Sequence, residues 1–449
     1  MDSYGNKNLT GRKSVTIIGG GLAGLSAAVF MAEKGFRVSV YEASPKIGGR
    51  VYSFFDKASG LKIDNGQHIL ASWYQNTFGY LKIIGSYDKL KFQKQLEVIF
   101  ADNDGSKYSL KASKLPPPLH LAGGIMGYKA LELKDKLAII RLVNTIKKAK
   151  VSENDLRSFN TDKLFELTRQ TGKAIEYFWK PFIIAVFNAE PQDTSAYLFA
   201  EMIKTGFIKK GGSELVLPDG YLSDIFIDPA KSYLESNQAY IKTNCGAAKF
   251  NIKDNSVTSV ILEDNTKIIS DFYICAVPFF NFNKLFSDQA LNEYFSSETN
   301  LKSSPIVNIH LKFDKDISGI FTSGFIGMLG THSQWVFKVT NDQVCIVISA
   351  AKEIAEMSKE DITETAINEL YSCLPEIKDR KVTYSRVIKE MRATFVPDSS
   401  SLSLRPVAKT KIKNLFLAGD WTNTGLPATI EGAVKSGRMA SNAVLDLLK

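Results

Sequence analysis

The chain has 449 residues, of which 44% are hydrophobic and 23% charged, as in an ordinary globular protein with a buried core. No apolar run approaches the roughly 18 residues of a membrane span, and residues 1–14 lack the apolar core of a secretory signal, so we expect a disordered lead-in there. The four cysteines and four histidines are scattered, which disfavours a disulfide framework or a metal site and favours reduced, buried thiols.

The net charge of +9 permits an anionic partner. The cations form no stripe interleaved with aromatic residues, and no nucleic-acid-binding module is recognisable. We therefore expect no nucleic acid partner and regard an anionic membrane surface as the better use of the charge.

Residues 14–42 form the most specific stretch of the chain. Val15–Ile18 is a β-branched run typical of a buried parallel strand, and Leu25–Lys34 is rich in helix formers and stops at Gly35. Arg37–Tyr41 predicts a second strand. This order of strand, helix and strand predicts a Rossmann-like nucleotide-binding unit.

Three glycines and one acid give this unit its chemistry. Gly19 allows a tight turn, Gly21 lets the backbone approach a pyrophosphate, and Gly24 lets the helix pack closely on the strand. The helix N-terminus offers free N–H groups to the phosphates. Glu42, at the end of the second strand, has the position of an acid that holds the ribose hydroxyls of adenosine.

The residues after Glu42 resemble flavoproteins of the amine oxidase and phytoene desaturase type, which favours FAD over NAD. In those proteins a loop like Gly48-Gly49-Arg50 lines the pyrophosphate and flavin, and a loop like IDNGQHIL, residues 63–70, passes close to the isoalloxazine. Two roles stay open for His68 in that loop: catalysis, or a hydrogen bond that holds the loop.

The middle of the chain predicts an α/β protein whose FAD-binding domain is built from discontinuous segments, with an inserted mixed α+β substrate domain. Strands are expected at Ala239–Thr243 and Phe272–Val277 in the first domain, and at Ile306–Phe313 and Gln343–Ser349 in the second. The expected boundaries are residues 14–90, 211–280 and 405–449 for the FAD-binding domain, and 91–210 and 281–404 for the substrate domain.

Residues 115–150 combine a rigid extended piece, Pro116–Pro118, with a basic amphipathic helix. Between Glu132 and Lys150 there are six cations and two acids. Such a helix can lie in a membrane interface. The alternative, a domain helix with a solvated basic face, fits the pattern equally well.

The C-terminal stretch AGDWTNTGLPATIEGAVKSG, residues 418–437, is more elaborate than a helix cap requires. A last parallel strand, Asn414–Ala418, is expected to end at Gly419-Asp420, where cofactors bind in such sheets. A turn over Gly425–Thr429 and a closing helix, Ile430–Leu448, follow. We expect this stretch to be the second half of the cofactor site, so that deleting residues 418–449 abolishes flavin binding.

The closing helix has a stripe of mostly small residues at Ala433, Gly437, Ala440 and Val444, expected to pack beside the first strand. Glu431 lies in the first helical turn. An acid there is favoured by the helix dipole, and a cofactor contact is the equally weighted alternative.

From about Ser14 to Leu448 the chain resembles the squalene-associated FAD-dependent desaturases, now understood as hydroxysqualene dehydroxylases. The motifs that carry the resemblance are DNGQHIL at 64–70, LPPPLHLAGG at 115–124, WKPFIIAVFNAEP at 179–191, RATFVP at 392–397 and AGDWTNTGLPATIEGAVKSGR at 418–438.

The resemblance implies that reduced FAD replaces the allylic hydroxyl of hydroxysqualene, a C30 isoprenoid, with hydrogen to give squalene. It implies one set of cofactor-binding residues: Gly19, Gly20, Gly21, Leu22, Ala23, Gly24, Glu42, Ala43, Gly48, Gly49, Arg50, Asn65, Gly66, Gln67, His68, Ala247, Gly419, Asp420, Gly425, Ala428, Thr429 and Glu431. His68, and more weakly Glu190, are candidate proton donors.

Two other readings remain. The first is a carotenoid desaturase or an amine oxidase of the same superfamily. The second is a non-enzymatic isoprenoid carrier. Because squalene-sized hydrocarbons dissolve in bilayers, we expect a cytoplasmic protein docked peripherally on the inner face of the cytoplasmic membrane.

Overall fold

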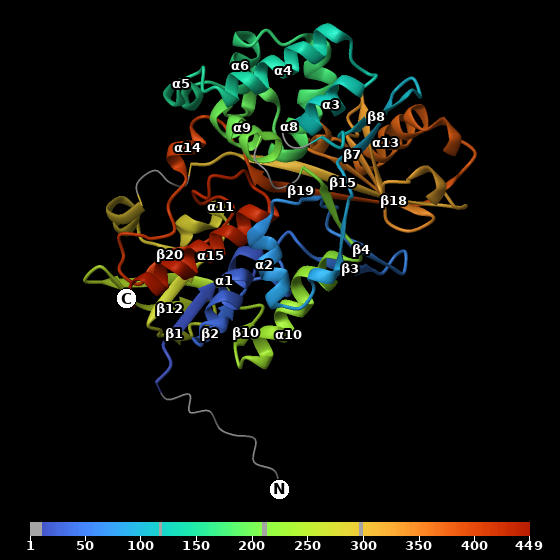
Figure 1. Cartoon of the computed structure of the whole chain (residues 1–449). Helices are drawn as coiled ribbons and strands as arrows, with labels where there is room; N and C mark the ends of the chain where they lie inside the picture. Colours follow the sequence, from blue (N-terminus) through green and yellow to red (C-terminus); the bar gives the residue numbers. More distant parts are fainter. Residues whose placement is uncertain (1–10, 116–118, 209–212, 296–299) are drawn as a thin grey trace.

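The computed structural model describes residues 11–115, 119–208, 213–295 and 300–449. Most of the expected lead-in, residues 1–10, and the predicted rigid piece Pro116–Pro118 lie outside the described residues. Figure 1 shows two parts of the molecule, one around α1 and α15 and the other around the long strands β15 and β19 with the helices α3 to α9 above them.

The first part is built on a five-stranded parallel sheet. Its strand order is β10 (Tyr240–Lys242), β2 (Arg37–Tyr41), β1 (Ser14–Ile18), β14 (Phe272–Cys275) and β20 (Leu415–Leu417). β1, at the centre, is buried along its whole length, which explains its β-branched sequence. The sheet thus gathers strands from the start, middle and end of the chain, and the α/β class expected from the sequence is confirmed.

The two faces of this sheet are covered differently. One face packs on α1 (Leu22–Glu33), α2 (Gln75–Ile83), α10 (Asp228–Ser236) and α15 (Ile430–Asp446). The other face packs on an antiparallel excursion of β11 (Ala247–Lys253), β12 (Ser256–Leu262) and β13 (Lys267–Ile268). β11 and β12 are joined at Asp254 and Asn255, whose φ angles of 51° and 56° are those of a tight hairpin turn.

The stripe of small residues on α15 packs against α1, not beside β1 as expected. A side chain at Gly437 would overlap the hydroxyl of Ser26 and lie 2.6 Å from the carbonyl oxygen of Ala23. The reason is geometric: α1 already covers β1, so the closing helix reaches the sheet beside α1. The contact joins the two ends of the chain, seen as the blue and red helices in Figure 1.

The second part is built on a mixed seven-stranded sheet. Its order is β19 (Val382–Phe395), β15 (Ser303–Phe313), β18 (Gln343–Ile348), β17 (Trp335–Lys338), β16 (Phe325–Leu329), β7 (Glu97–Asp102) and β8 (Lys107–Lys111). All neighbours are antiparallel except β16 and β7. A small sheet of β5 (Leu70–Ala71), β9 (Leu215–Pro218) and β6 (Leu90–Phe92) lies outside both large sheets.

Helices cover both faces of the mixed sheet. One face packs on a cluster that includes α3 (Leu119–Gly127), α4 (Leu133–Lys147), α5 (Glu153–Ser158), α6 (Thr161–Leu167), α8 (Lys180–Phe187) and α9 (Ala196–Ile203). The other face packs on α13 (Lys359–Cys373). All four cysteines are free and buried, as expected.

α4 has the amphipathic character predicted for residues 115–150. Ile139, Leu142 and Ile146 are buried, whereas Leu133 and Leu137 are 60% and 50% exposed. The helix begins with a capping box in which the backbone N–H of Glu132 donates to the carboxylate of Asp135. Within the described ranges, no helix is long and apolar enough to cross a membrane.

Candidate functional site

One long cavity of about 890 Å³ runs from the parallel sheet into the second part of the molecule. This volume is at the upper end of the roughly 300–1,000 Å³ typical of small-molecule sites. One end is lined by glycines and polar residues from the carboxyl ends of β1, β2 and β20. The other end is lined by aromatic and aliphatic side chains.

The glycine-rich turn leaves the N-terminus of α1 open to the cavity. Gly21 caps this helix, no acid occupies its first turn, and the nearest atom to a side chain built on Gly21 would be Cα of Gly49, 3.9 Å away. The two loops are tied together by the N–H of Gly48, which donates to the carbonyl of Gly20 at 2.8 Å. N–H groups at a helix N-terminus, next to a glycine that leaves space for a ligand, fit a pyrophosphate.

Gly19 and Gly24 shape this turn. Gly19 has φ = +105° and lines the cavity. A side chain on Gly24 would overlap the carbonyl oxygen of Gly19 and lie 3.2 Å from Cβ of Ala276. Gly24 therefore lets the helix pack closely, as predicted, and together with Gly20 it does not line the cavity.

Glu42 lies at the cavity wall at the end of β2. Its carboxylate accepts hydrogen bonds from the N–H of Gly20 at 2.6 Å and of Ser44 at 2.8 Å. A carboxylate has about four acceptor positions, so each oxygen keeps room for a ribose hydroxyl. Ala43 and Ala247 line the same end of the cavity.

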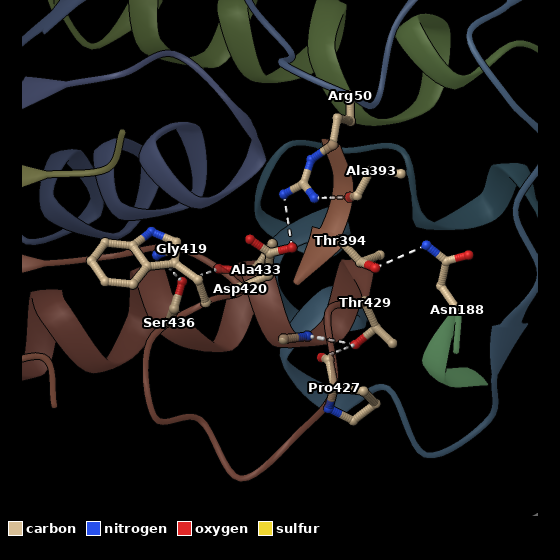
Figure 2. Close-up of polar contacts among 12 residues, drawn as sticks. Arg50, Asn188, Ala393, Thr394, Gly419, Asp420, Pro427, Thr429, Ala433 and Ser436 are labelled. Carbon is tan, nitrogen blue, oxygen red and sulfur yellow. Dashed lines mark hydrogen bonds and ion pairs between the residues drawn. The ribbon is translucent and has the colours of Figure 1, made fainter. Parts of the chain in front are cut away.

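Arg50 and Asp420 connect the two sequence halves of the site (Figure 2). Nη2 of Arg50 lies 2.7 Å from Oδ2 of Asp420, and Nη1 donates to the carbonyl of Ala393 on β19. Asp420 is buried while Arg50 is partly open to the cavity. The guanidinium thus stands between the glycine-rich loop, the C-terminal turn and the second sheet.

The C-terminal turn is held by its own polar contacts. Thr429 caps α15 by accepting from the N–H of Gly432 at 3.0 Å, and the N–H of Gly419 donates to Ser436 at 2.8 Å (Figure 2). Buried Arg405 donates to the carbonyls of Asp420, Trp421 and Thr422. Arg405 was not predicted as a site residue, because its only local signal is a cation before a proline.

The carboxylate of Glu431 forms hydrogen bonds with residues of α2. Its carboxylate accepts from the N–H and side-chain amide of Asn76 and from the N–H and hydroxyl of Thr77, at 2.7 to 3.1 Å. It therefore satisfies the start of α2 and does not line the cavity; nor does Gly425. Glu431 lies in the first turn of α15, where the dipole role was expected, but its hydrogen bonds to α2 were not predicted.

The loop of residues 64–68 lines the cavity opposite the C-terminal turn. Asn65 donates to the carbonyl of Arg50 at 3.3 Å, and Gln67 donates to the carboxylate of Asp64 at 3.2 Å. Nδ1 of His68 lies 3.2 Å from the carbonyl oxygen of Gly66 and therefore carries the hydrogen. Burial lowers the pKa of His68 to about 4, so its imidazole is neutral near pH 7.

Glu190 lies away from the cavity. Its carboxylate faces Nζ of Lys180 at 3.4 Å, and the residue is absent from the cavity wall. It is therefore not a proton donor to anything bound there.

The far end of the cavity is apolar. Its wall consists largely of aliphatic and aromatic side chains from β7, β8, α3, α8, β17 and two π-helical turns, η2 (Ile175–Trp179) and η4 (Lys204–Ile208): Leu96, Val98, Phe100, Leu110, Leu121, Phe178, Phe182, Val186, Phe207 and Phe337. π-Helical turns are frequent at functional sites.

Several polar residues of the wall were not among the predicted site residues, and three of them are Asn188, Asn308 and Thr394. Asn188 ends α8 with φ = +50°, and its amide donates to Thr394 at 2.9 Å (Figure 2). Asn308 lies within the strand IVNIHLKF on the face that it shares with His310 and Lys312, so the alternation of polar and apolar residues gave no sign that it lines a cavity.

Comparison with known proteins agrees with this architecture. The sequence profile of the flavin-containing amine oxidoreductases matches residues 22–445. The chain belongs to this family of flavin-dependent oxidoreductases.

Among curated relatives, the chain is 32% identical over 438 residues to the hydroxysqualene dehydroxylase of Zymomonas mobilis, covering 96% of this chain and 99% of that protein. It is 29% identical over 440 residues to the enzyme of the same name from Sinorhizobium fredii, covering 96% and 98%. The resemblance stated from the motifs is thereby confirmed.

Solved structures share the fold. An oxidoreductase from Methanosarcina mazei superposes with a TM-score of 0.74 at 18% identity, covering 96% of this chain and all of that one. A putrescine oxidase bound to putrescine superposes with a TM-score of 0.72 at 14% identity, covering 98% and 99%.

Proposed function

We propose that this protein is a hydroxysqualene dehydroxylase. The reaction breaks the allylic C–O bond of hydroxysqualene, forms a C–H bond at the same carbon, and releases the oxygen with a proton as water. When bound, reduced FAD supplies the hydride. The relatives named hydroxysqualene dehydroxylase, which match along almost the whole chain, support this assignment.

FAD would occupy the polar end of the cavity. The N-terminus of α1 with Gly21 and Gly49 would hold the pyrophosphate, Glu42 the adenosine ribose, and the Arg50–Asp420 pair the region between the phosphates and the flavin. The remaining wall residues of the predicted set are Gly19, Leu22, Ala23, Ala43, Gly48, Asn65, Gly66, Gln67, His68, Ala247, Gly419, Ala428 and Thr429.

The observation that carries the substrate assignment is the apolar far end of the cavity. A C30 isoprenoid is a flexible hydrocarbon with few groups that can form hydrogen bonds. The apolar wall, which includes Leu96 and Phe337, provides aromatic and aliphatic surface for it to contact. The same wall excludes water, which protects an allylic cation from capture.

In this proposal His68 holds the loop and does not donate the proton. Its hydrogen-bearing nitrogen faces the carbonyl of Gly66, and the low pKa of about 4 leaves no imidazolium near pH 7. The proton that completes the water molecule therefore comes from elsewhere, and Glu190 is also too remote to give it.

The test is direct. Holoprotein reduced with dithionite under anaerobic conditions is incubated with hydroxysqualene, and squalene is sought by mass spectrometry with stoichiometric flavin oxidation. Squalene formation supports the proposal. If squalene never forms, and phytoene or an amine reduces the oxidised flavin instead, the protein is a desaturase or an amine oxidase, and the proposal is wrong.

We further propose that the protein takes its substrate from a membrane surface. Leu119, Met126, Leu133 and Leu137 on α3 and α4 are 45% to 60% exposed. Exposed lysines such as Lys134 flank them. Leu121, on the same helix as Leu119, lines the cavity, so the exposed apolar side chains lie next to the apolar end of the site.

A further inference from the structure

Asn308 of β15 has a buried amide oxygen without a hydrogen-bond partner among the described residues. The side chain is 3% exposed, and its Oδ1 has no partner in the part of the chain that the structure describes. Buried polar groups in native proteins are nearly always paired, and an exception often marks a ligand site. Asn308 also lines the cavity, so the unpaired group lies at its wall.

The position of this amide in the cavity is well defined. A side chain built on Gly66 would lie 3.0 Å from both Oδ1 and Nδ2 of Asn308, so the amide rests on the loop of residues 64–68. On the same face of β15, Nε2 of His310 lies 3.0 Å from the carbonyl oxygen of Asp64. The resemblance implies that this loop would lie beside the isoalloxazine of a bound FAD, so the Asn308 amide would be near the flavin.

Asn308 belongs to a row of opposite residues across the sheet. It is opposite Val347 on β18, and Val347 is opposite Trp335 on β17. Residues opposite one another in antiparallel strands point to the same face, and all three line the cavity. Along this row the wall changes from an amide beside Gly66 to apolar surface toward Trp335. Such a wall suits a ligand that carries one polar group on a hydrocarbon chain.

A second buried asparagine of the wall provides the contrast. The amide of Asn188 donates to Ser304 at 3.2 Å and to Thr394 at 2.9 Å, and accepts from the N–H of Ala350 at 2.6 Å. Asn188 is therefore a structural amide with its partners in place. Asn308 is buried to a similar extent, but its amide oxygen has no hydrogen-bond partner among the described residues.

We propose that Asn308 binds the hydroxyl group of the alcohol substrate and thereby selects the carbon that reacts. This inference rests on the proposed function. A hydroxyl can donate to the amide oxygen and accept from the amide N–H, so it pairs an oxygen that no described residue pairs. The hydrocarbon product lacks the hydroxyl, leaves the amide unpaired again, and binds more weakly than the substrate.

The test compares Asn308→Leu, which keeps the branched outline of the side chain, with the wild-type holoprotein. Dissociation constants for hydroxysqualene and squalene are measured in the same detergent micelles by quenching of tryptophan fluorescence. The wild type is expected to prefer the alcohol by roughly tenfold or more. In the variant this preference is expected to fall to about one, through weaker binding of the alcohol, with flavin content unchanged.

A stability measurement separates this role from a structural one. Because the amide oxygen has no partner among the described residues, Asn308→Leu is expected to leave Tm unchanged or raise it. Asn188→Gly, which removes a paired amide at a position where glycine adopts φ = +50° without strain, is expected to lower Tm. A lower Tm for Asn308→Leu would assign Asn308 to structure and overturn the inference.

Other outcomes overturn the inference as clearly. If Asn308→Leu keeps the preference for the alcohol while Trp335→Phe abolishes it, the indole N–H, which is also buried without a partner among the described residues, binds the hydroxyl instead. If Asn308→Leu loses flavin, the amide serves the cofactor. If the wild-type protein forms squalene but does not bind the alcohol more tightly than squalene, only the role of Asn308 is wrong. If the wild-type protein forms no squalene, the proposed function is wrong as well.

Discussion

Arg50 and Asp420 form an ion pair of 2.7 Å across 370 residues of sequence. The pair joins the loop that follows the first strand–helix–strand unit to the turn that precedes the last helix. Each half of the proposed cofactor site therefore depends on the other. The expected deletion of residues 418–449 would remove α15 from the core as well, so point substitutions at this pair test the idea more cleanly.

A double-mutant cycle with Arg50→Met and Asp420→Asn measures this dependence. We expect each substitution to weaken flavin binding by about tenfold, because a hydrogen bond to a charged group is lost in a largely enclosed site. The coupling in the free energy of unfolding is expected to be only about 0.5–1 kcal/mol, because the Arg50 side chain is 40% exposed and screened by solvent.

The matched control is the surface pair Lys62–Asp224, with an N–O distance of 2.5 Å and side chains 36% and 40% exposed. Neither residue lines the cavity. Lys62→Met is expected to leave flavin binding unchanged. Equal loss of flavin in Lys62→Met and Arg50→Met would show that general stability, not the site, controls retention.

The lowered pKa of His68 predicts a pH dependence of stability. The pKa is about 4 in the folded protein against 6.5 for the free side chain, so between these values the unfolded chain binds more protons. The free energy of unfolding should therefore fall as pH drops from 6.5 to 4, by up to about 1.4 kcal/mol per pH unit for each such histidine. His310, whose pKa burial also lowers to about 4, adds to the same slope.

His68→Gln is expected to make this slope shallower in denaturant titrations between pH 4 and 7. The same variant should lower the rate of squalene formation less than tenfold, because removal of a true general acid costs typically 10²–10⁴-fold. An unchanged slope would refute the neutral assignment. A rate loss beyond 10²-fold with unchanged flavin content would make His68 a catalytic residue.

Much of the fold could be predicted from local sequence patterns. The features that were not predicted depend on contacts between residues far apart in the sequence. The β-branched run before Gly19 and the glycine spacing after it are local, and they predicted the first strand and helix. The hydrophobic stripe of α4 is equally local.

By contrast, the position of Asn308 in the cavity depends on the strand register that places it beside Val347. It also depends on the contact with Gly66, 242 positions earlier in the sequence. No periodicity within residues 303–313 contains that information. The packing of Gly437 on α1 and the engagement of Glu431 with α2 were missed for the same reason: each contact joins the two ends of the chain.

The exposed leucines of α4 predict membrane binding that depends on apolar contact as well as charge. Leu133→Ser combined with Leu137→Ser should reduce flotation with phosphatidylglycerol vesicles several-fold, because two insertable side chains are lost. Tm should change little, since both side chains are exposed in solution.

Leu167→Ser on α6 is the control for this experiment, because Leu167 is 52% exposed but lies on another helix. It should float like the wild type. Phosphatidylcholine vesicles, which carry no net charge, should bind every variant weakly. Equal flotation of the double variant and Leu167→Ser would rule out the α3–α4 surface as the docking face.

The packing of α15 on α1 has a consequence for how the protein is made. β1 and α1 are synthesised first, yet β14, β20 and α15, which complete their surroundings, are synthesised 250 to 430 residues later. Until the last helix leaves the ribosome, the apolar surface of α1 is uncovered and the glycine-rich turn lacks its opposite wall. The nascent chain therefore exposes this apolar surface from the synthesis of α1 until α15 has emerged, and the proposed flavin site cannot be completed before then.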